Sequence, residues 1–293
     1  MSLEKMLFEI DALKKEVSNM PKPSQAIMDK HMEHFITSYT YNSNAIEGST
    51  LTLRDTHRVL VEGITINKKP LRDHLDAINH RDAMEFVLTL SKNKYDLTER
   101  DIIQIQSIVL ANEPSLKGKY RDIQVYIAGT SHTPPSPPEI RELMDNLLMS
   151  YHSSKTHPLM NIADFHVRFE RIHPFGDGNG RTGRLILNLE LIKSGYQPID
   201  VKFKDREDYL DALDDFAITG STLTFTEMVA QYQLEELTSL RNVLQGRLDT
   251  IKYRMENGEA EHVCEDGKKI YHEQLNDLSK QEQTKPRVEP PSR

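Results

Sequence analysis

The chain has 293 residues, and its charged fraction of 28% beside a hydrophobic fraction of 37% is typical of a soluble protein with a substantial core. Its formal net charge of -8 argues against a protein that holds nucleic acid mainly through phosphates, and no apolar run is long enough to cross a membrane. The single cysteine, Cys264, excludes an internal disulfide and a four-cysteine zinc site. Because the first residues also lack the pattern of a secretion signal, we expect a cytoplasmic protein without membrane or nucleic-acid partners.

Most of the chain is expected to be helical, beginning with an N-terminal helical region. Ser24 is a candidate N-cap, and the apolar residues after it share one helical face: Ile27, Met28, Phe35, Ile36 and Tyr39. The segment SNAIEG, residues 43–48, ends this helix, and Gly48 stands where a helix stop is expected.

Further helices are expected along the rest of the chain. Capping-box patterns predict helix starts at Thr52, Thr98 and Ser136. Periodic apolar residues predict helices over residues 75–90, 158–172, 182–193 and 226–253. Beyond Ser279 almost nothing is apolar and prolines are frequent, which predicts a disordered tail.

Only one segment has the pattern of a β-strand. Residues 123–127 alternate apolar and less apolar side chains, with β-branched residues at every second position. Gly129 and Thr130 then predict a turn, and residues 131–133 could return as a second strand before prolines interrupt it. Because one hairpin is too small to form a core, we expect a small flap on an all-α helical bundle.

The sequence IHPFGDGNGRTGR is the part of the chain that is richest in chemically useful side chains. If a helix begins near Gly180, the backbone N–H groups of Gly178, Asn179 and Gly180 lack partners and lie at the positive end of the helix dipole. Such an end binds anions, and glycines let a phosphate approach the backbone closely. Arg181 and Arg184 lie on neighbouring positions of one helical face, which suits a polyphosphate.

Two further side chains complete a set suited to phosphoryl transfer. Asp177 directly precedes the glycines, and a lone carboxylate beside phosphates is a usual ligand of Mg²⁺. His173 is suited to accept a proton at neutral pH. A glycine-rich turn can be purely structural, and a lone histidine often only ends a helix, but the combination of four such side chains favours catalysis. A site with only His173 and Asp177 as metal ligands has too few partners nearby.

This loop is similar to the signature of the Fic-domain family, His-x-Phe-x-Asp/Glu-Gly-Asn-Gly-Arg-x-x-Arg, and every fixed position is matched. The resemblance implies an all-α Fic fold and the transfer of AMP from ATP to a Ser, Thr or Tyr hydroxyl of a target protein. It implies that His173 deprotonates the hydroxyl and that Asp177 holds Mg²⁺ between the α- and β-phosphates. Asn179 and the glycine amides would stabilise charge on the α-phosphate, and Arg181 and Arg184 would stabilise the leaving pyrophosphate.

Residues 43–48 match a second family pattern, Ser/Thr-x-x-x-Glu-Gly/Asn, which begins at Ser43. In Fic proteins similar to this one, the pattern lies on an inhibitory helix packed against the active site. The resemblance implies that Glu47 pairs with Arg184, takes the place of the γ-phosphate and forces ATP into an unproductive pose. Spacing alone favours an ordinary surface glutamate at a helix C-terminus, and the full catalytic motif beside it favours the inhibitory role. Glu47 could instead orient a water molecule that removes AMP from modified targets.

The expected hairpin falls where the family carries its flap. An exposed edge at Val125, Tyr126 and Ile127 could hold an extended target segment by strand addition, with its hydroxyl directed at His173. A hairpin that binds nothing fits the alternation equally well. Tyr209 resembles a family position near the nucleotide.

These expectations divide the chain into a helical region over residues 1–42, a Fic catalytic domain over 43–245 and a C-terminal extension over 246–293. The expected function is that of an autoinhibited protein adenylyltransferase that uses ATP and Mg²⁺. A de-AMPylating hydrolase, a transferase of another phosphate-containing group and a non-catalytic nucleotide-binding regulator stay open as alternatives. Homodimers are common among relatives, although no residue here demands one.

Overall fold

The computed structural model describes residues 1–126, 132–257, 263 and 267–272, and the regular secondary structure within them is helical. The α-helices are α1 (Leu3–Asn19), α2 (Gln25–Ile46), α3 (Leu53–Leu60), α4 (Leu71–Leu90), α5 (Glu99–Val109), α6 (Ile140–Ser153), α7 (Pro158–Ile172), α8 (Asn179–Lys193), α9 (Arg206–Thr219) and α10 (Leu223–Glu256). Short 3-10 turns, η1 (Pro137–Glu139) and η2 (Phe203–Asp205), precede α6 and α9. None of the described helices is both long enough and apolar enough to span a membrane.

The predicted helix starts are confirmed, with local contacts that explain them. The Thr52 hydroxyl accepts a hydrogen bond from the backbone N–H of Asp55 at 3.1 Å, and the Asp55 carboxylate accepts one from the N–H of Thr52. Thr98 begins α5 with the same reciprocal arrangement. These side chains satisfy N–H groups that the first turn of a helix leaves without partners.

Helix α2 also ends where the sequence predicts. Its last residue is Ile46, Glu47 is the C-cap, and Gly48 has a φ of 95°. Only glycine adopts this left-handed conformation without strain, so the chain turns away from the helix axis at Gly48. As a result, the side chain of Glu47 is carried on the exposed end of α2.

Helix α9 lies where the sequence analysis predicts no helix. Its acidic residues interrupt the apolar pattern, because Glu207, Asp208, Asp211, Asp214 and Asp215 surround a narrow stripe. Only Tyr209 and Ala212 of this helix are buried. A stripe this narrow gives a weak periodic signal, which explains the missed helix.

The predicted β-hairpin is not seen in the described part of the chain. Residues 123–126 and 132–136 have no regular secondary structure, and residues 127–131, including Ile127 of the expected flap edge, lie outside the described residues. The expected disordered tail after Ser279 also lies outside them. The all-α fold class is therefore confirmed, whereas the flap stays a prediction.

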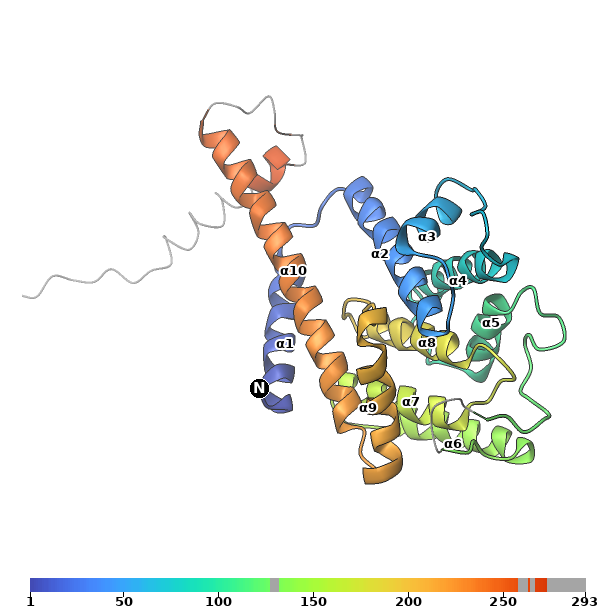
Figure 1. Cartoon of the computed structure of the whole chain (residues 1–293). Helices are drawn as coiled ribbons and strands as arrows, with labels where there is room; N and C mark the ends of the chain where they lie inside the picture. Colours follow the sequence, from blue (N-terminus) through green and yellow to red (C-terminus); the bar gives the residue numbers. More distant parts are fainter. Residues whose placement is uncertain (127–131, 258–262, 264–266, 273–293) are drawn as a thin grey trace, which may run out of the picture.

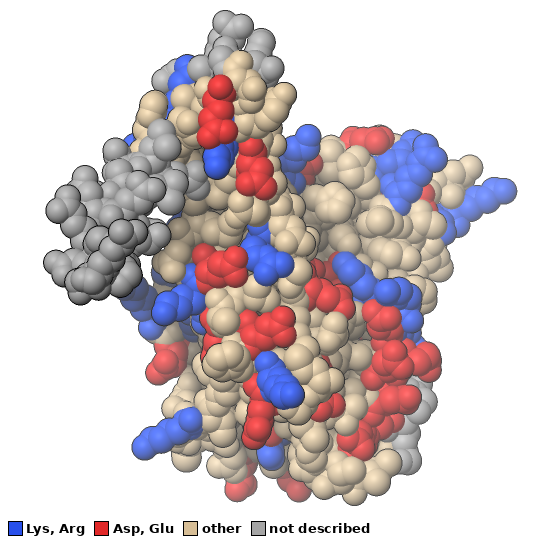
Figure 2. All heavy atoms as spheres, turned by 90° about the vertical axis from the view of Figure 1, so that its left-hand side faces the viewer, with Lys and Arg blue, Asp and Glu red and all other residues tan. Residues whose placement is uncertain are grey.

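Helix α8 lies between two hydrophobic cores, which fixes the segment that follows the glycine-rich loop. Leu185, Ile186 and Leu189 belong to a core shared with α4, α5, α6 and α7. Leu187 and Leu191 belong to a second core shared with α1, α7, α9 and α10. Figure 1 shows α1 and the long α10 side by side along one flank of the remaining helices. On the face in Figure 2, acidic and basic side chains are interspersed rather than separated.

Helix α1 is expected to be part of the folded core, which Ile10 tests. Ile10 is fully buried between α1 and its neighbours, so Ile10→Ala should lower the free energy of unfolding by about 2–5 kcal/mol. Denaturant unfolding measures this change. Phe8→Ala on the same helix is the matched control, because Phe8 is 79% exposed and its loss should have little effect. Equal effects of the two substitutions would contradict the docking of α1.

Candidate active site

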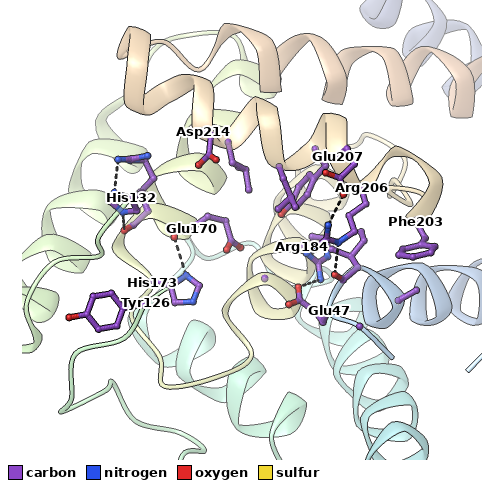
Figure 3. A pocket seen from close by; sticks show the side chains of 18 residues that line it. Glu47, Tyr126, His132, Glu170, His173, Arg184, Phe203, Arg206, Glu207 and Asp214 are labelled. Carbon is purple, nitrogen blue, oxygen red and sulfur yellow. Dashed lines mark hydrogen bonds and ion pairs between the residues drawn. The ribbon is translucent and has the colours of Figure 1, made fainter. Parts of the chain in front are cut away.

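A cavity of about 680 Å³ lies where the ends of several helices meet. Its walls include the C-terminal end of α2, the last turn of α7, the first turns of α8 and part of α9. Tyr126 and His132, from the chain between α5 and α6, complete one side of it. Figure 3 shows His173 and Glu47 on opposite sides of this cavity. The two sequence motifs therefore meet in one site.

His173 ends α7 in a conformation that orients its ring. Its φ of 49° is left-handed, which is uncommon for a residue with a side chain. Ring nitrogen Nδ1 lies 3.2 Å from the backbone carbonyl oxygen of Glu170. Because a carbonyl only accepts, Nδ1 carries the hydrogen and Nε2 keeps its lone pair in the neutral ring. Burial lowers the pKa of His173, against opposing effects of the Glu170 carbonyl and the Glu47 carboxylate.

The loop after His173 is held by Asn179. Its side-chain oxygen accepts from the Phe175 N–H at 2.8 Å, and its side-chain nitrogen donates to the Phe175 carbonyl, also at 2.8 Å. Phe175 is fully buried, so this pair of bonds anchors the loop to the core. The Asn179 side chain is thus occupied in shaping the loop. Contrary to the expectation from the sequence, the Gly178 N–H also has a partner, Oδ1 of Asp177, which leaves the backbone amides of Asn179 and Gly180 as donors at the start of α8.

Glu47 lies directly against the first turn of α8. A Cβ atom at Gly180 would collide with Oε1 of Glu47 and would lie 3.0 Å from Nη1 of Arg184. The missing side chain therefore makes the room that the carboxylate occupies. An anion at this end of a helix is favoured by the helix dipole and the unpaired N–H groups.

Arg184 joins α8 to α2 through a buried guanidinium. Nη2 donates to Oε1 of Glu47 at 2.7 Å and to the Ser43 carbonyl at 2.9 Å, and Nε donates to the Ser43 hydroxyl at 3.0 Å. Only 2% of the Arg184 side chain is exposed, compared with 40% of the Glu47 side chain. Burial by itself lowers the pKa of Arg184, but the charge and hydrogen bond of the Glu47 carboxylate, together with Tyr209 and Glu170, hold that pKa above its usual range.

Two residues of α9 support the ion pair of Glu47 with Arg184. Arg206, at the start of α9, donates from Nε to the Ile46 carbonyl at 3.0 Å and so holds the end of α2 that carries Glu47. Tyr209 lies beneath Arg184, whose guanidinium carbon is 5.6 Å from the ring centroid. The Tyr209 hydroxyl is 2.9 Å from Nε2 of the buried His166. Arg184 is therefore surrounded by groups from α2, α7 and α9.

Asp177 and Arg181 form a separate charged group. Arg181 is buried and pairs with Asp76 of α4 at 3.1 Å, with a longer contact of 3.5 Å to Asp177. Asp177 also pairs with Arg72 at 2.9 Å and accepts from the Gly178 N–H at 2.6 Å. Neither Asp177 nor Arg181 is among the cavity's described walls. Among the described residues, no cluster of three or more His, Cys, Asp or Glu is arranged to hold a metal ion.

Glu170 is a cavity residue that the sequence analysis missed. It lies on α7 one turn before His173, is buried, and has an oxygen, Oε1, without a hydrogen-bond partner. A Cβ atom at Gly183 would collide with that oxygen, so this glycine, at a variable position of the signature, makes room for it. Burial raises the pKa of Glu170 to about 8, which leaves the carboxyl neutral at pH 7. Its position between the apolar Phe169 and Ile172 was the available signal.

The neutral state of Glu170 predicts a pH-dependent stability. Its pKa rises from 4.5 to about 8 on folding, so the folded protein keeps a proton that the unfolded chain releases in this range. The contribution of Glu170 to stability should therefore fall as the pH rises from about 5 to 8, whereas burial lowers the pKa values of His80 and His166, which act in the opposite direction below about pH 6.5. Relative to wild type, Glu170→Gln should therefore gain stability between pH 5 and pH 8 by a few kcal/mol, at about 1.4 kcal/mol per pKa unit.

Denaturant unfolding at pH 5 and pH 8 tests this expectation. Glu142→Gln, at an exposed glutamate of α6, is the matched control and should keep the wild-type pH dependence. A stability difference between Glu170→Gln and wild type that is the same at pH 5 and pH 8 would contradict the raised pKa of Glu170.

Comparisons with known proteins agree with this geometry. The family model for the Fic/DOC family matches residues 96–191. A Nematostella vectensis protein named protein adenylyltransferase Fic is 32% identical over 237 residues, which cover 78% of this chain and 54% of the relative. The chain thus spans about half the length of the curated relatives it matches.

Solved structures are similar over most of the chain. Fic-1, residues 134–508, from C. elegans has a TM-score of 0.74 and 30% identity, and the match covers 83% of this chain and 73% of that one. A Fic-domain-containing signaling protein from Bacteroides thetaiotaomicron has a TM-score of 0.75 and 25% identity, with 82% and 97% covered. The sequence motif, the fold and these relatives agree, and the chain belongs to the Fic/DOC family.

Proposed function

We propose that this chain is a protein adenylyltransferase restrained by its own Glu47. It transfers AMP from ATP to a Ser, Thr or Tyr hydroxyl of a target protein and releases pyrophosphate. The observation that carries the proposal is the ion pair of Glu47 with Arg184, at the start of α8 and in the same cavity as a neutral His173. The curated relatives named protein adenylyltransferase Fic support the same reaction.

The transfer step uses His173 as the general base. Nε2 accepts the proton of the target hydroxyl while the hydroxyl oxygen attacks the α-phosphorus. A new phosphorus–oxygen bond forms, the bond between the α-phosphorus and the bridging oxygen breaks, and pyrophosphate leaves with that electron pair. The depressed pKa of His173 supports this role because the ring is then unprotonated at neutral pH.

The phosphates of ATP are proposed to bind at the start of α8. The backbone N–H groups of Asn179 and Gly180 supply neutral donors, and Arg184 supplies a positive charge. The structure leaves Arg181 paired with Asp76, so contact with pyrophosphate requires that pair to rearrange. A Mg²⁺ ion that takes most ligands from water and phosphate fits the single carboxylate of Asp177, and when bound it would neutralise phosphate charge.

The restraint follows from competition for one position. A phosphate that pairs with Arg184 must displace the Glu47 carboxylate, because that carboxylate already lies against Gly180 and Nη2 of Arg184. If Glu47 stays, it repels the phosphate and withholds a charge-assisted hydrogen bond. ATP then binds without its full set of contacts, and the α-phosphate is not presented to His173.

The target is proposed to approach from the side of Tyr126 and His132. Tyr126 is 80% exposed at the cavity and offers an aromatic surface next to His173, with Val125 beside it. Docking by strand addition needs the flap edge around Ile127, which lies outside the described residues. The catalytic domain over residues 43–245 is proposed to act as one unit with α1 and the rest of α10, which pack on it.

The proposal predicts that removing Glu47 activates transfer. With α-labelled ATP and Mg²⁺, Glu47→Gly should incorporate at least about tenfold more label into protein than wild type, because Arg184 is freed for phosphate. Glu47→Gly combined with His173→Ala should incorporate none. Mass spectrometry of labelled protein identifies the added group and separates AMP transfer from transfer of another phosphate-containing group.

Two outcomes would favour the alternatives. Loss of AMP from a modified target, with no gain of label, would indicate a de-AMPylating hydrolase. Binding of ATP by Glu47→Gly with no transfer in any preparation would indicate a nucleotide-binding regulator. Glu142→Gln serves as the surface control and should behave as wild type.

The pKa of His173 predicts the pH dependence of transfer. Activity should fall on acidification as Nε2 becomes protonated, and because burial lowers this pKa the fall should be centred below pH 6.5. The Glu47 carboxylate raises the pKa of His173, so Glu47→Gly should move the midpoint to lower pH than Glu47→Asp. Initial transfer rates between pH 5 and 8 measure both midpoints, and a midpoint at or above 6.5 in Glu47→Gly would contradict the assignment.

A further inference from the structure

Arg121 is a buried arginine that binds backbone on three sides. Nε donates to the carbonyl of His173 at 2.8 Å, Nη1 to that of Ile123 at 3.1 Å, and Nη2 to that of Pro135 at 2.5 Å. Its own backbone N–H donates to the carbonyl of Pro174 at 3.0 Å. Only 5% of Arg121 is exposed, and its acceptors are all carbonyl oxygens. One guanidinium thus joins three stretches of chain.

These stretches are the turn at His173 and the two described ends of the chain between α5 and α6, which are residues 121–126 and 132–136. Gln124 adds a bond between the same ends, because its side-chain nitrogen donates to the Pro134 carbonyl at 2.9 Å. The ends carry Tyr126 and His132, which line the cavity beside His173. Arg121 therefore sets the distance between the base and the side of the cavity where we propose that the target approaches.

The His132 side of this arrangement is fixed to α7 as well. Nη2 of Arg171 lies 2.7 Å from Nδ1 of His132, and Nε2 of His132 lies 2.8 Å from the Arg171 carbonyl. Since the guanidinium only donates and the carbonyl only accepts, Nε2 of His132 carries the hydrogen. These two bonds thus join the His132 side of the cavity to the last turn of α7, with His173 at the end of that turn.

An arginine is the side chain that this position requires. Burying a charge is costly, and burial lowers the pKa of Arg121, so its retention calls for several good acceptors. The planar fork of guanidinium N–H groups satisfies three carbonyls in different directions, which a lysine ammonium on a flexible stem does not. The bond to the His173 carbonyl also holds a residue whose left-handed backbone needs support.

We propose that Arg121 is a positioning residue for the transfer reaction. It aligns Nε2 of His173 with the target side of the cavity by holding the His173 carbonyl and both described ends of the chain between α5 and α6. The inference rests on the proposed function. It assigns Arg121 no contact with ATP, because the groups proposed to bind phosphate are Arg184 and the first turn of α8.

The test compares Arg121→Lys and Arg121→Met in the Glu47→Gly protein. Both should lower the initial rate of label incorporation at saturating α-labelled ATP by about a hundredfold, because displacing a catalytic group by about 1 Å can lower a rate by that factor. The dissociation constant for the non-hydrolysable analogue AMPPNP, measured by calorimetry, should stay within about twofold of the parent. Arg168→Met is the matched control on the surface of α7 and should change neither quantity.

The pH dependence of the transfer rate distinguishes the positioning of His173 from the effect of the positive charge of Arg121. The positive charge of Arg121 lowers the pKa of His173, so Arg121→Met should move the acid midpoint of the transfer rate upward. Arg121→Lys keeps the charge and should leave the midpoint in place while the rate still falls. If Arg121→Met does not fold, as judged by circular dichroism, Arg121→Lys alone decides the question.

The inference and the proposed function fail in different ways. Absence of label transfer by Glu47→Gly with Arg121 intact would overturn the proposed function. Transfer that is present and unchanged in Arg121→Lys would overturn the inference alone. Equal loss of AMPPNP binding and transfer would show that Arg121 only supports the fold, which also overturns it.

Discussion

The burial of Arg184 is the constraint on which the site depends. A guanidinium that is 2% exposed needs a carboxylate or phosphate partner, because an unpaired charge in the interior is strongly unfavourable. In this structure the partner is Glu47, supported by the hydroxyl and carbonyl of Ser43. The end of α2 must therefore lie against the start of α8. In the proposed reaction a phosphate of ATP replaces the Glu47 carboxylate as the partner of Arg184. Restraint and catalysis therefore depend on the same position beside this guanidinium.

The turn at His173 depends on contacts made away from the atoms that are proposed to react. The carbonyl of Glu170 fixes the ring of His173, the side chain of Asn179 closes the loop on Phe175, and Arg121 holds the His173 carbonyl. Each contact uses a backbone group or a loop position, so the geometry tolerates little change in the loop. Within the signature, Asn179 and Phe175 keep the shape of the loop, whereas Glu170 and Arg121 support it from outside the signature.

Much of the site could be predicted because its signals are local. Glycines, capping boxes and a histidine at a helix end act over a few residues, and the start of α8 and the stop at Gly48 follow from them. Glu170 and Arg121 could not be assigned this way, because their roles arise from burial and from partners that come together only in the fold. Helix α9 was missed for the same reason. The role of its buried Tyr209 depends on the contact with Arg184, which exists only in the fold. The β pattern of residues 123–127 predicts a strand, but in its described part, residues 123–126, the Ile123 carbonyl accepts a hydrogen bond from the Arg121 side chain and the Gln124 side chain donates one to the Pro134 carbonyl.

The Glu47 carboxylate is proposed to occupy a phosphate position beside Arg184. Calorimetric titration of wild type and Glu47→Gln with ATP and with AMP tests this proposal, because only ATP carries phosphates that reach Arg184 in the productive pose. Removal of the charge should tighten ATP binding by at least about tenfold, or about 1.4 kcal/mol, and should change AMP binding by less than about twofold. Equal ATP affinities for the two proteins, or equal gains for ATP and AMP, would contradict the claim.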